Sequence, residues 1–148
     1  MSLAMTKDER EAFLADLHVG VLGIPEPGRG PLTVPIWYAY EPGGALWFVT
    51  DRASRKGGLL AGGVRVSLCA QVETPPYRYV SVEGPIVSIE PADRERHVRP
   101  MAHRYLGVEL GDRYVEATAG EREAGGSMVV SVRPERWLSV DYRKQFGS

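Results

Sequence analysis

The fold is decided by the alternating stretch Val64-Arg65-Val66-Ser67-Leu68-Cys69-Ala70-Gln71-Val72. Its apolar residues occupy every second position, and the positions between them are polar or small. This alternation predicts a β-strand with one buried face. After Pro75-Pro76, residues 77–89 continue as a long strand in which Val80 and Val82 face opposite to Tyr79, and Gly84-Pro85 predicts a bulge or bend.

Five further runs outside this stretch are typical of strands and are separated by turns rich in Gly and Pro: residues 19–24, 32–40, 45–50, 128–132 and 137–142. Helices are expected after the Thr6/Glu9 capping box, over part of 54–63, and from Pro91 onward, where apolar residues recur at helical spacing. Residues 107–126 are polar and are expected to be partly helical around residues 114–119.

These elements predict one domain over residues 1–148, mainly β within the α+β class. Its six or seven antiparallel strands are expected to form a split β-barrel with a few flanking helices, because closing the sheet protects strand edges. Residues 1–5 are expected to be disordered or to stem from cloning, with Met5 as a native start.

Composition limits the classes of function. The net charge of −1 comes from 18 basic and 19 acidic residues, so it gives no general attraction for nucleic acid or anionic membranes. Apolar runs are too short to span a bilayer and no signal peptide is recognisable, which predicts a cytoplasmic protein. Cys69 is the only cysteine, so neither an intramolecular disulfide nor a thiolate zinc cluster is expected.

The segment from Thr50 to Lys56 is the clearest candidate for binding chemistry. A strand end supplies the Thr50 hydroxyl, and the following turn supplies Ser54, Arg55 and Lys56. Hydroxyl groups, a guanidinium and an ammonium are the donors that bind phosphate oxygens. The same pattern also fits a solvated surface turn, so the residues alone leave both interpretations open.

This segment, followed by a strand such as Arg65-Val66-Ser67-Leu68, resembles the FMN-binding split barrel of the pyridoxamine 5′-phosphate oxidase-like superfamily. The resemblance covers residues 13–91 and, more loosely, 136–141. It implies a homodimer with two equivalent cofactor sites in the interface. It further implies that Val49, Thr50, Arg55 and Lys56 contact the ribityl phosphate, with Ser54 beside them. The backbone of Val34-Pro35-Ile36-Trp37 is implied to lie along the isoalloxazine ring.

Two departures from that family bear on the reaction. Tyr79 stands where the FMN-type oxidases carry glutamine, and nothing after Trp137 supplies their motif for the pyridoxal phosphate substrate. Pyridoxamine phosphate oxidation is therefore not expected. Residues 75–84 look more like the branch that uses the deazaflavin coenzyme F-420, for whose acidic tail Arg52 and Arg78 are candidates.

The sequence thus predicts an oxidoreductase that transfers a hydride between bound deazaflavin or FMN and a small conjugated substrate. Trp37 and Trp137 are candidates to wall the planar ring. No side chain is identified as a general acid or base. One alternative is a binding protein or carrier without turnover, for a flavin, a deazaflavin or haem. Another is a structural homologue that binds none of these ligands.

Overall fold

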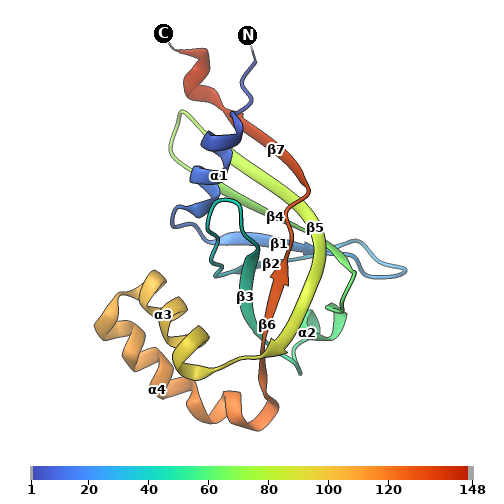
Figure 1. The fold of residues 1–148 in the computed structure, drawn as a ribbon, viewed down its shortest axis with the longest axis vertical. Helices are drawn as coiled ribbons and strands as arrows, with labels where there is room; N and C mark the ends of the chain where they lie inside the picture. Colours follow the sequence, from blue (N-terminus) through green and yellow to red (C-terminus); the bar gives the residue numbers. More distant parts are fainter. Residues whose placement is uncertain (1, 147–148) are drawn as a thin grey trace.

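The computed structural model describes residues 2–146, without the side chains of residues 121–125. Its sheet has the strand order β2-β1-β4-β5-β6-β3, and β7 pairs with β5 beside this path. Every pairing is antiparallel, and the sheet curls into a partly open barrel (Figure 1). The predicted fold class is confirmed. The strands are β1 (Gly20–Ile24), β2 (Leu32–Ile36), β3 (Leu46–Asp51), β4 (Arg65–Val72), β5 (Arg78–Pro91), β6 (Ser127–Val132) and β7 (Arg136–Asp141).

Strand β5 holds the barrel together because it pairs with three other strands. Its first half lies between β4 and β7, and its second half pairs with β6. A bulge or bend was predicted at Gly84-Pro85, and an irregularity is present two residues further on, where the register against β6 shifts between Ile86 and Ser88. Gly84 is needed at the bend, because a Cβ there would overlap the carbonyl oxygen of Arg133.

The alternating faces of the strands build the core. Val66, Leu68 and Ala70 of β4 are buried, whereas Arg65 and Ser67 are exposed, as the sequence pattern predicted. Helix α1 (Lys7–Ala15) begins with the predicted capping box and adds Phe13 and Leu14 to this core. Residues 2–5 continue along the barrel: Met5 is buried, and the carbonyl oxygen of Leu3 accepts a hydrogen bond from the Asp141 N–H.

The remaining helices differ from the prediction in two places. Pro91 ends β5 and does not begin a helix; Asp93 caps the following turn by accepting from the N–H groups of Glu95 and Arg96. Residues 107–126 are helical over almost their whole length and not only around residues 114–119, because they contain the complete 18-residue helix Val108–Gly125. The helices after α1 are α2 (Arg55–Leu59), a π-turn (Arg94–Val98), α3 (Arg99–Leu106), α4 (Val108–Gly125) and a terminal 3₁₀ turn (Tyr142–Gln145). None of the described helices is long and apolar enough to cross a bilayer.

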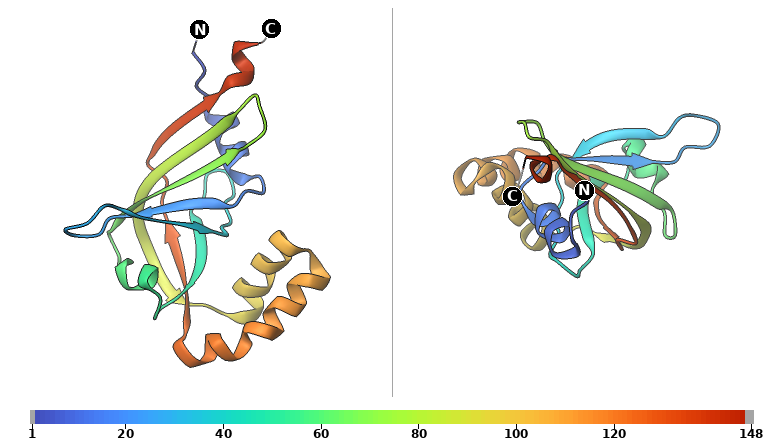
Figure 2. Two further views of the ribbon diagram at one scale, coloured as in Figure 1. Left: turned by 180° about the vertical axis from the view of Figure 1, so that it is seen from behind. Right: turned by 90° about the horizontal axis from the view of Figure 1, so that it is seen from above.

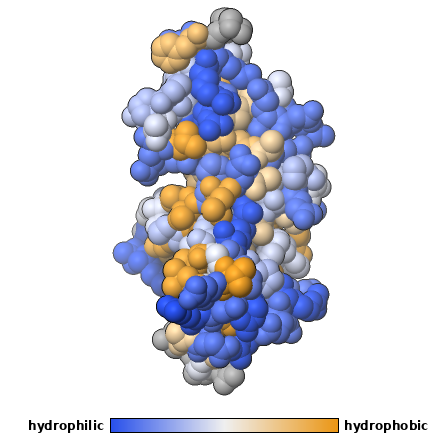
Figure 3. All heavy atoms as spheres, turned by 90° about the vertical axis from the view of Figure 1, so that its left-hand side faces the viewer, coloured by the Kyte–Doolittle hydropathy of each residue, from blue (hydrophilic) through white to orange (hydrophobic). Residues whose placement is uncertain are grey.

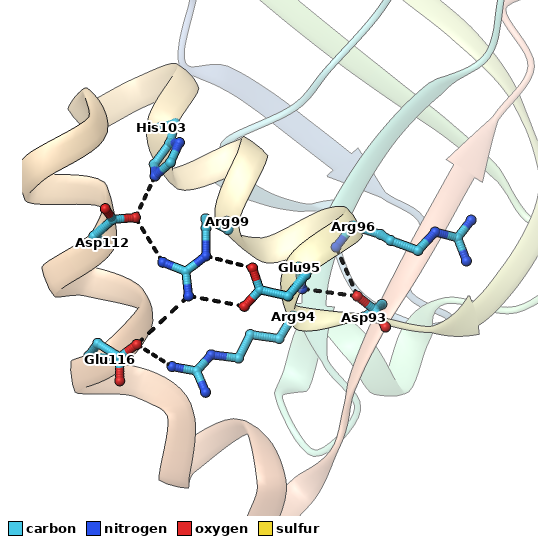
Figure 4. Close-up of polar contacts among 8 residues, drawn as sticks. All are labelled: Asp93, Arg94, Glu95, Arg96, Arg99, His103, Asp112 and Glu116. Carbon is cyan, nitrogen blue, oxygen red and sulfur yellow. Dashed lines mark hydrogen bonds and ion pairs between the residues drawn. The ribbon is translucent and has the colours of Figure 1, made fainter.

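Apolar packing and charged side chains together join α3 to α4: Val115 of α4 is buried against Val98 and Ala102. Arg99 lies between Glu95 and Asp112, with Nη1 2.7 Å from the Asp112 carboxylate, and His103 contacts the same carboxylate at 2.6 Å (Figure 4). The hydrogen bond from His103, which has the larger effect, and the hydrogen bond from Arg99 lower the pKa of Asp112. The left-handed Gly107 (φ 81°) allows the chain to reverse between the two helices. Figures 1 and 2 show this helical hairpin standing beside the barrel at the end away from the termini.

Candidate functional site

Two adjoining cavities, of about 240 and 350 Å³, form a groove between the barrel and the α3–α4 hairpin. Both are lined by Trp37, Val49, Lys56 and Tyr114. The first cavity extends to the end of β3 and the start of α2, and the second extends along β2. The groove therefore brings together the segment predicted to bind phosphate and the strand predicted to contact a ring.

Thr50 lies in the first cavity with an unused hydroxyl group. Its side chain belongs to the inner face of β3, where the residue is 5% exposed. Its Oγ1 is enclosed and has no hydrogen-bond partner among the residues that the structure describes. Burying a hydroxyl without a partner destabilises the folded state. A ligand oxygen that accepts a hydrogen bond from Thr50 would remove that free-energy cost.

Lys56 supplies the positive charge of the groove. Burial lowers the pKa of its ammonium group, and the nearby Asp51 carboxylate partly opposes this shift. Within the described part of the chain, no carboxylate lies within ion-pair distance of Lys56. A half-buried and unpaired ammonium is poised for an anionic ligand, since an oxyanion would recover part of the lost hydration energy.

Ser54 and Arg55 are engaged elsewhere. Ser54 caps α2: its Oγ accepts from the Gly57 N–H at 3.0 Å and donates to the Asp51 carbonyl oxygen at 2.7 Å. The tight turn leaves no room for a Cβ at Gly57, which would overlap that same carbonyl oxygen. Arg55 does not line the groove and forms an ion pair with Glu26 at 2.7 Å. Of the predicted phosphate donors Thr50, Ser54, Arg55 and Lys56, only Thr50 and Lys56 have neither a hydrogen-bond nor an ion-pair partner among the residues that the structure describes.

The ring-facing stretch of β2 divides between the two faces of the sheet. Pro35 and Trp37 line the second cavity, Val34 packs against the core, and the buried Ile36 belongs to the core while bordering the same cavity. The Trp37 ring is stacked on Tyr105, with centroids 5.1 Å apart and planes 6° apart, and Tyr114 approaches it at a tilt of 51°. These neighbours hold the indole as part of the groove wall.

The helical hairpin adds residues that sequence reasoning did not assign to the site: Val98, Met101, Tyr114 and Thr118. Val98 and Met101 belong to the apolar stripe of the expected helix, which indicated burial but not what the stripe covers. The hairpin is held to the barrel through α3. Tyr105 Oη accepts from the Tyr38 N–H and donates to the His18 carbonyl oxygen.

Four further candidate residues lie outside the groove. Arg78 has its guanidinium 5.2 Å from the centre of the Phe13 ring, on the α1 side of the sheet. Trp137 lies there too, in contact with Tyr40 and Arg10. Tyr79 faces the opposite, outer side, because it alternates with the buried Val80. Arg52, considered for an acidic tail, lines a separate cavity beside Gly126.

Exposed apolar side chains gather on the side that carries α3 and α4 (Figure 3). Val108 and Leu110, at the tip of the helical hairpin, are 65% and 52% exposed. Leu17 and Val19 are also exposed, and Val19 lines the second cavity. The groove is therefore polar at the end near Thr50 and more apolar at the end near β2.

Similar folds are known among solved structures. A conserved hypothetical protein of Mycobacterium tuberculosis, Rv2991, superposes with a TM-score of 0.74 at 24% identity, over 98% of this chain and 90% of that one. An F420 reductase superposes with a TM-score of 0.59 at 22% identity, over 86% of this chain and 94% of that one. The FAD-binding protein of Mycobacterium smegmatis superposes with a TM-score of 0.59 at 14% identity, over 91% of this chain and 95% of that one. No curated protein sequence matches.

Identities this low establish a shared fold and leave the ligand of this chain open. The sequence itself gives the stronger assignment, because a family model matches it from residue 6 to residue 141, almost its whole length. That span includes every strand and the complete groove. The chain belongs to the pyridoxamine 5′-phosphate oxidase family.

Proposed function

We propose that the groove binds a flavin-type cofactor, either FMN or the deazaflavin F-420, and that the protein is an oxidoreductase. The observation that carries this proposal is the buried Thr50 hydroxyl, which lacks a partner among the described residues and belongs to a residue that lines one cavity together with the unpaired Lys56. A phosphate group would accept from both donors. The cofactor ring would then extend along Pro35-Ile36-Trp37, in the second cavity.

The F420 reductase and the FAD-binding protein among the similar structures support the same class of cofactor. When bound, such a cofactor supplies hydride chemistry to a small conjugated substrate. The chain's own residues fix its position. Lys56 and Thr50 hold the phosphate, Trp37 provides a wall that Tyr105 keeps in place, and the α3–α4 hairpin limits the access of water.

We further propose that a second copy of the chain completes the site. Five residues stand in one row across the outer face of the sheet: Pro35, Val21, Cys69, Ser81 and Leu138. Val21 is 43% exposed and Leu138 is 60% exposed, which leaves an uncovered apolar face. Pro35 also lines the groove, so a chain docked on this face would form another wall of it and could bring its own Tyr79 close.

A carrier without turnover is the second candidate, for a flavin, a deazaflavin or haem. The ionisable side chains that line the groove are Asp51, Lys56 and Tyr114. The proposal uses Lys56 for the phosphate and assigns no side chain as a general acid or base toward a substrate. The two functions separate in one assay: rapid oxidation of the bound reduced cofactor by a quinone or enone supports the enzyme, and tight binding without turnover supports the carrier.

Titration of the protein with FMN and, separately, with reduced deazaflavin tests the site. At least one should bind with micromolar affinity. Lys56→Gln should weaken that binding by about tenfold or more, because it removes a charge-assisted phosphate contact. Arg55→Gln is the matched control, since it removes an equal charge one residue away that pairs with Glu26 outside the groove. Failure to bind either cofactor, or equal effects of the two substitutions, would reject the proposal.

A further inference from the structure

A second recess lies at the other end of β3 from the groove. It is open to solvent, has a volume of about 540 Å³ and is bordered by α1, the β2–β3 turn, β5, β7 and the loop before β7. Strand β3 leads from the β2–β3 turn to Thr50, and five strand residues separate the recess at the turn from Thr50 in the groove by about 17 Å. Figures 1 and 2 place α1 toward the termini and α2 toward the opposite end. The recess is therefore separate from the proposed cofactor site, and its volume is in the usual range for small-molecule sites.

Arg10 is the distinctive residue of this recess. Its guanidinium carbon lies 4.8 Å from the centre of the Trp137 ring, a cation–π arrangement that fixes the side chain. Its Nε is enclosed and has no acceptor among the residues that the structure describes. Such a donor has lost its hydration without gaining a protein partner, and a carboxylate can supply two parallel hydrogen bonds to a guanidinium.

The charges around the recess favour a monoanion. Lys7, Arg10, Glu11 and Arg133 line it. The Arg133 guanidinium is neutralised by Glu135, to which it donates from Nε at 3.1 Å and from Nη2 at 3.0 Å. Lys7 and Arg10 then outweigh Glu11 by one positive charge, and Glu11 accepts a hydrogen bond from Tyr40. An anion carrying a single charge would balance the site.

The rest of the lining is apolar and aromatic. Val87, which is 46% exposed, Pro134 and Ala45 form walls beside Trp137 and Tyr40. A highly hydrated ion such as phosphate gains nothing from these walls, whereas the flat body of an aromatic acid would cover them. We infer that this recess is a binding site for a small aromatic carboxylate, with its carboxylate on Arg10 and its ring between Trp137, Val87 and Pro134.

Benzoate serves as the probe, with calorimetric titration of the intact protein and the indole N–H signal of Trp137 in NMR as readouts. We expect saturable binding to one site and a shift of that signal. Arg10→Gln should weaken binding by at least about tenfold, because it removes the charged partner of the carboxylate. Arg29→Gln removes the same charge from the exposed turn between β1 and β2 and should leave the affinity unchanged.

Three results would overturn the inference: no saturable binding of benzoate, unchanged affinity in Arg10→Gln, or phosphate binding as tightly as benzoate at equal ionic strength. Competition between benzoate and FMN would also count against it, by locating benzoate in the groove. Should Arg10→Gln fail to fold, Arg10→Lys and Lys7→Gln replace it, and unchanged affinity in both gives the same negative answer. The inference does not depend on the proposed function, because it needs no bound cofactor.

Discussion

Replacement of Thr50 by valine should stabilise the free protein and weaken its binding of cofactor. The two side chains have nearly the same shape, so Thr50→Val removes the hydroxyl without opening a cavity. Burying a hydroxyl without a partner costs about 1–3 kcal/mol. The lower end of this range is the conservative expectation for Thr50, whose Oγ1 is enclosed. The variant should therefore gain about 1 kcal/mol in free energy of unfolding, a rise in Tm of about 2–4 °C for a chain of this length.

The same substitution should have the opposite effect on the loaded protein. A hydrogen bond from the hydroxyl to a phosphate oxygen contributes about 1.5–3 kcal/mol, so the dissociation constant should rise by about tenfold to a hundredfold. Urea unfolding of the free protein and titration with FMN or F-420 measure the two effects separately.

Two controls make the result decisive. Thr33→Val makes the same chemical change at an exposed position of β2 and should affect neither measurement strongly. Ser127→Ala removes a hydroxyl that does have a partner, the Asp51 carboxylate at 3.0 Å, and should cost about 1.5–3 kcal/mol. A Thr50→Val variant as destabilised as Ser127→Ala would show that the Thr50 hydroxyl is satisfied in the free protein, and unchanged cofactor affinity would remove it from the phosphate site.

Three further predictions concern the barrel, its pH dependence and its outer face. Gly84→Ala should cost about 3 kcal/mol in urea unfolding, because the added Cβ overlaps the Arg133 carbonyl oxygen; Gly30→Ala, in open space, should be tolerated. The hydrogen bond from the Lys144 ammonium, which has the largest effect, and that from the Thr6 N–H lower the pKa of Glu9 from 4.5 to about 2. Because the folded state lowers this pKa, the Glu9 carboxylate contributes to stability above pH 4.5, and this contribution is lost as the pH falls toward 2. Glu9→Gln should abolish that part of the acid dependence, and a stability-versus-pH curve unchanged by the substitution would contradict it. Leu138→Glu should convert a dimer into monomers in analytical ultracentrifugation and weaken cofactor binding, whereas Leu110→Glu, equally apolar and exposed on the helical hairpin, should do neither.

Much of the barrel was predictable because strand alternation is a local property. The faces of residues 64–72, the capping box at Thr6 and the bend after Gly84 follow from side chains a few positions apart, and the structure contains all three. The start of the helical region was predicted wrongly at Pro91. Proline is compatible with a strand end as well as with a helix start, and the Asp93 cap decides between the two. The helix over residues 108–125 was underestimated because its support comes from tertiary contacts: Val115 packs against Val98 and Ala102, and Asp112 pairs with Arg99 and His103.

In the candidate site, too, some features follow from the local sequence and others only from the tertiary structure. Thr50 and Lys56 could be selected from the sequence because a hydroxyl and a cation follow a strand end at short spacing. That Ser54 and Arg55 are engaged elsewhere depends on the turn geometry and on Glu26, which is 29 residues away. Tyr114 and Thr118 reach the groove only because Gly107 folds α4 back along α3.

The sequence by itself determined the strands, their buried faces and the family, since each depends on short-range pattern and residue type. Only the tertiary structure decided which donors in the segment from Thr50 to Lys56 remain unpaired, because partners are chosen by distance in space. It also decided that the helical hairpin forms part of the groove, and that Trp137 lies with Arg10 in a separate recess.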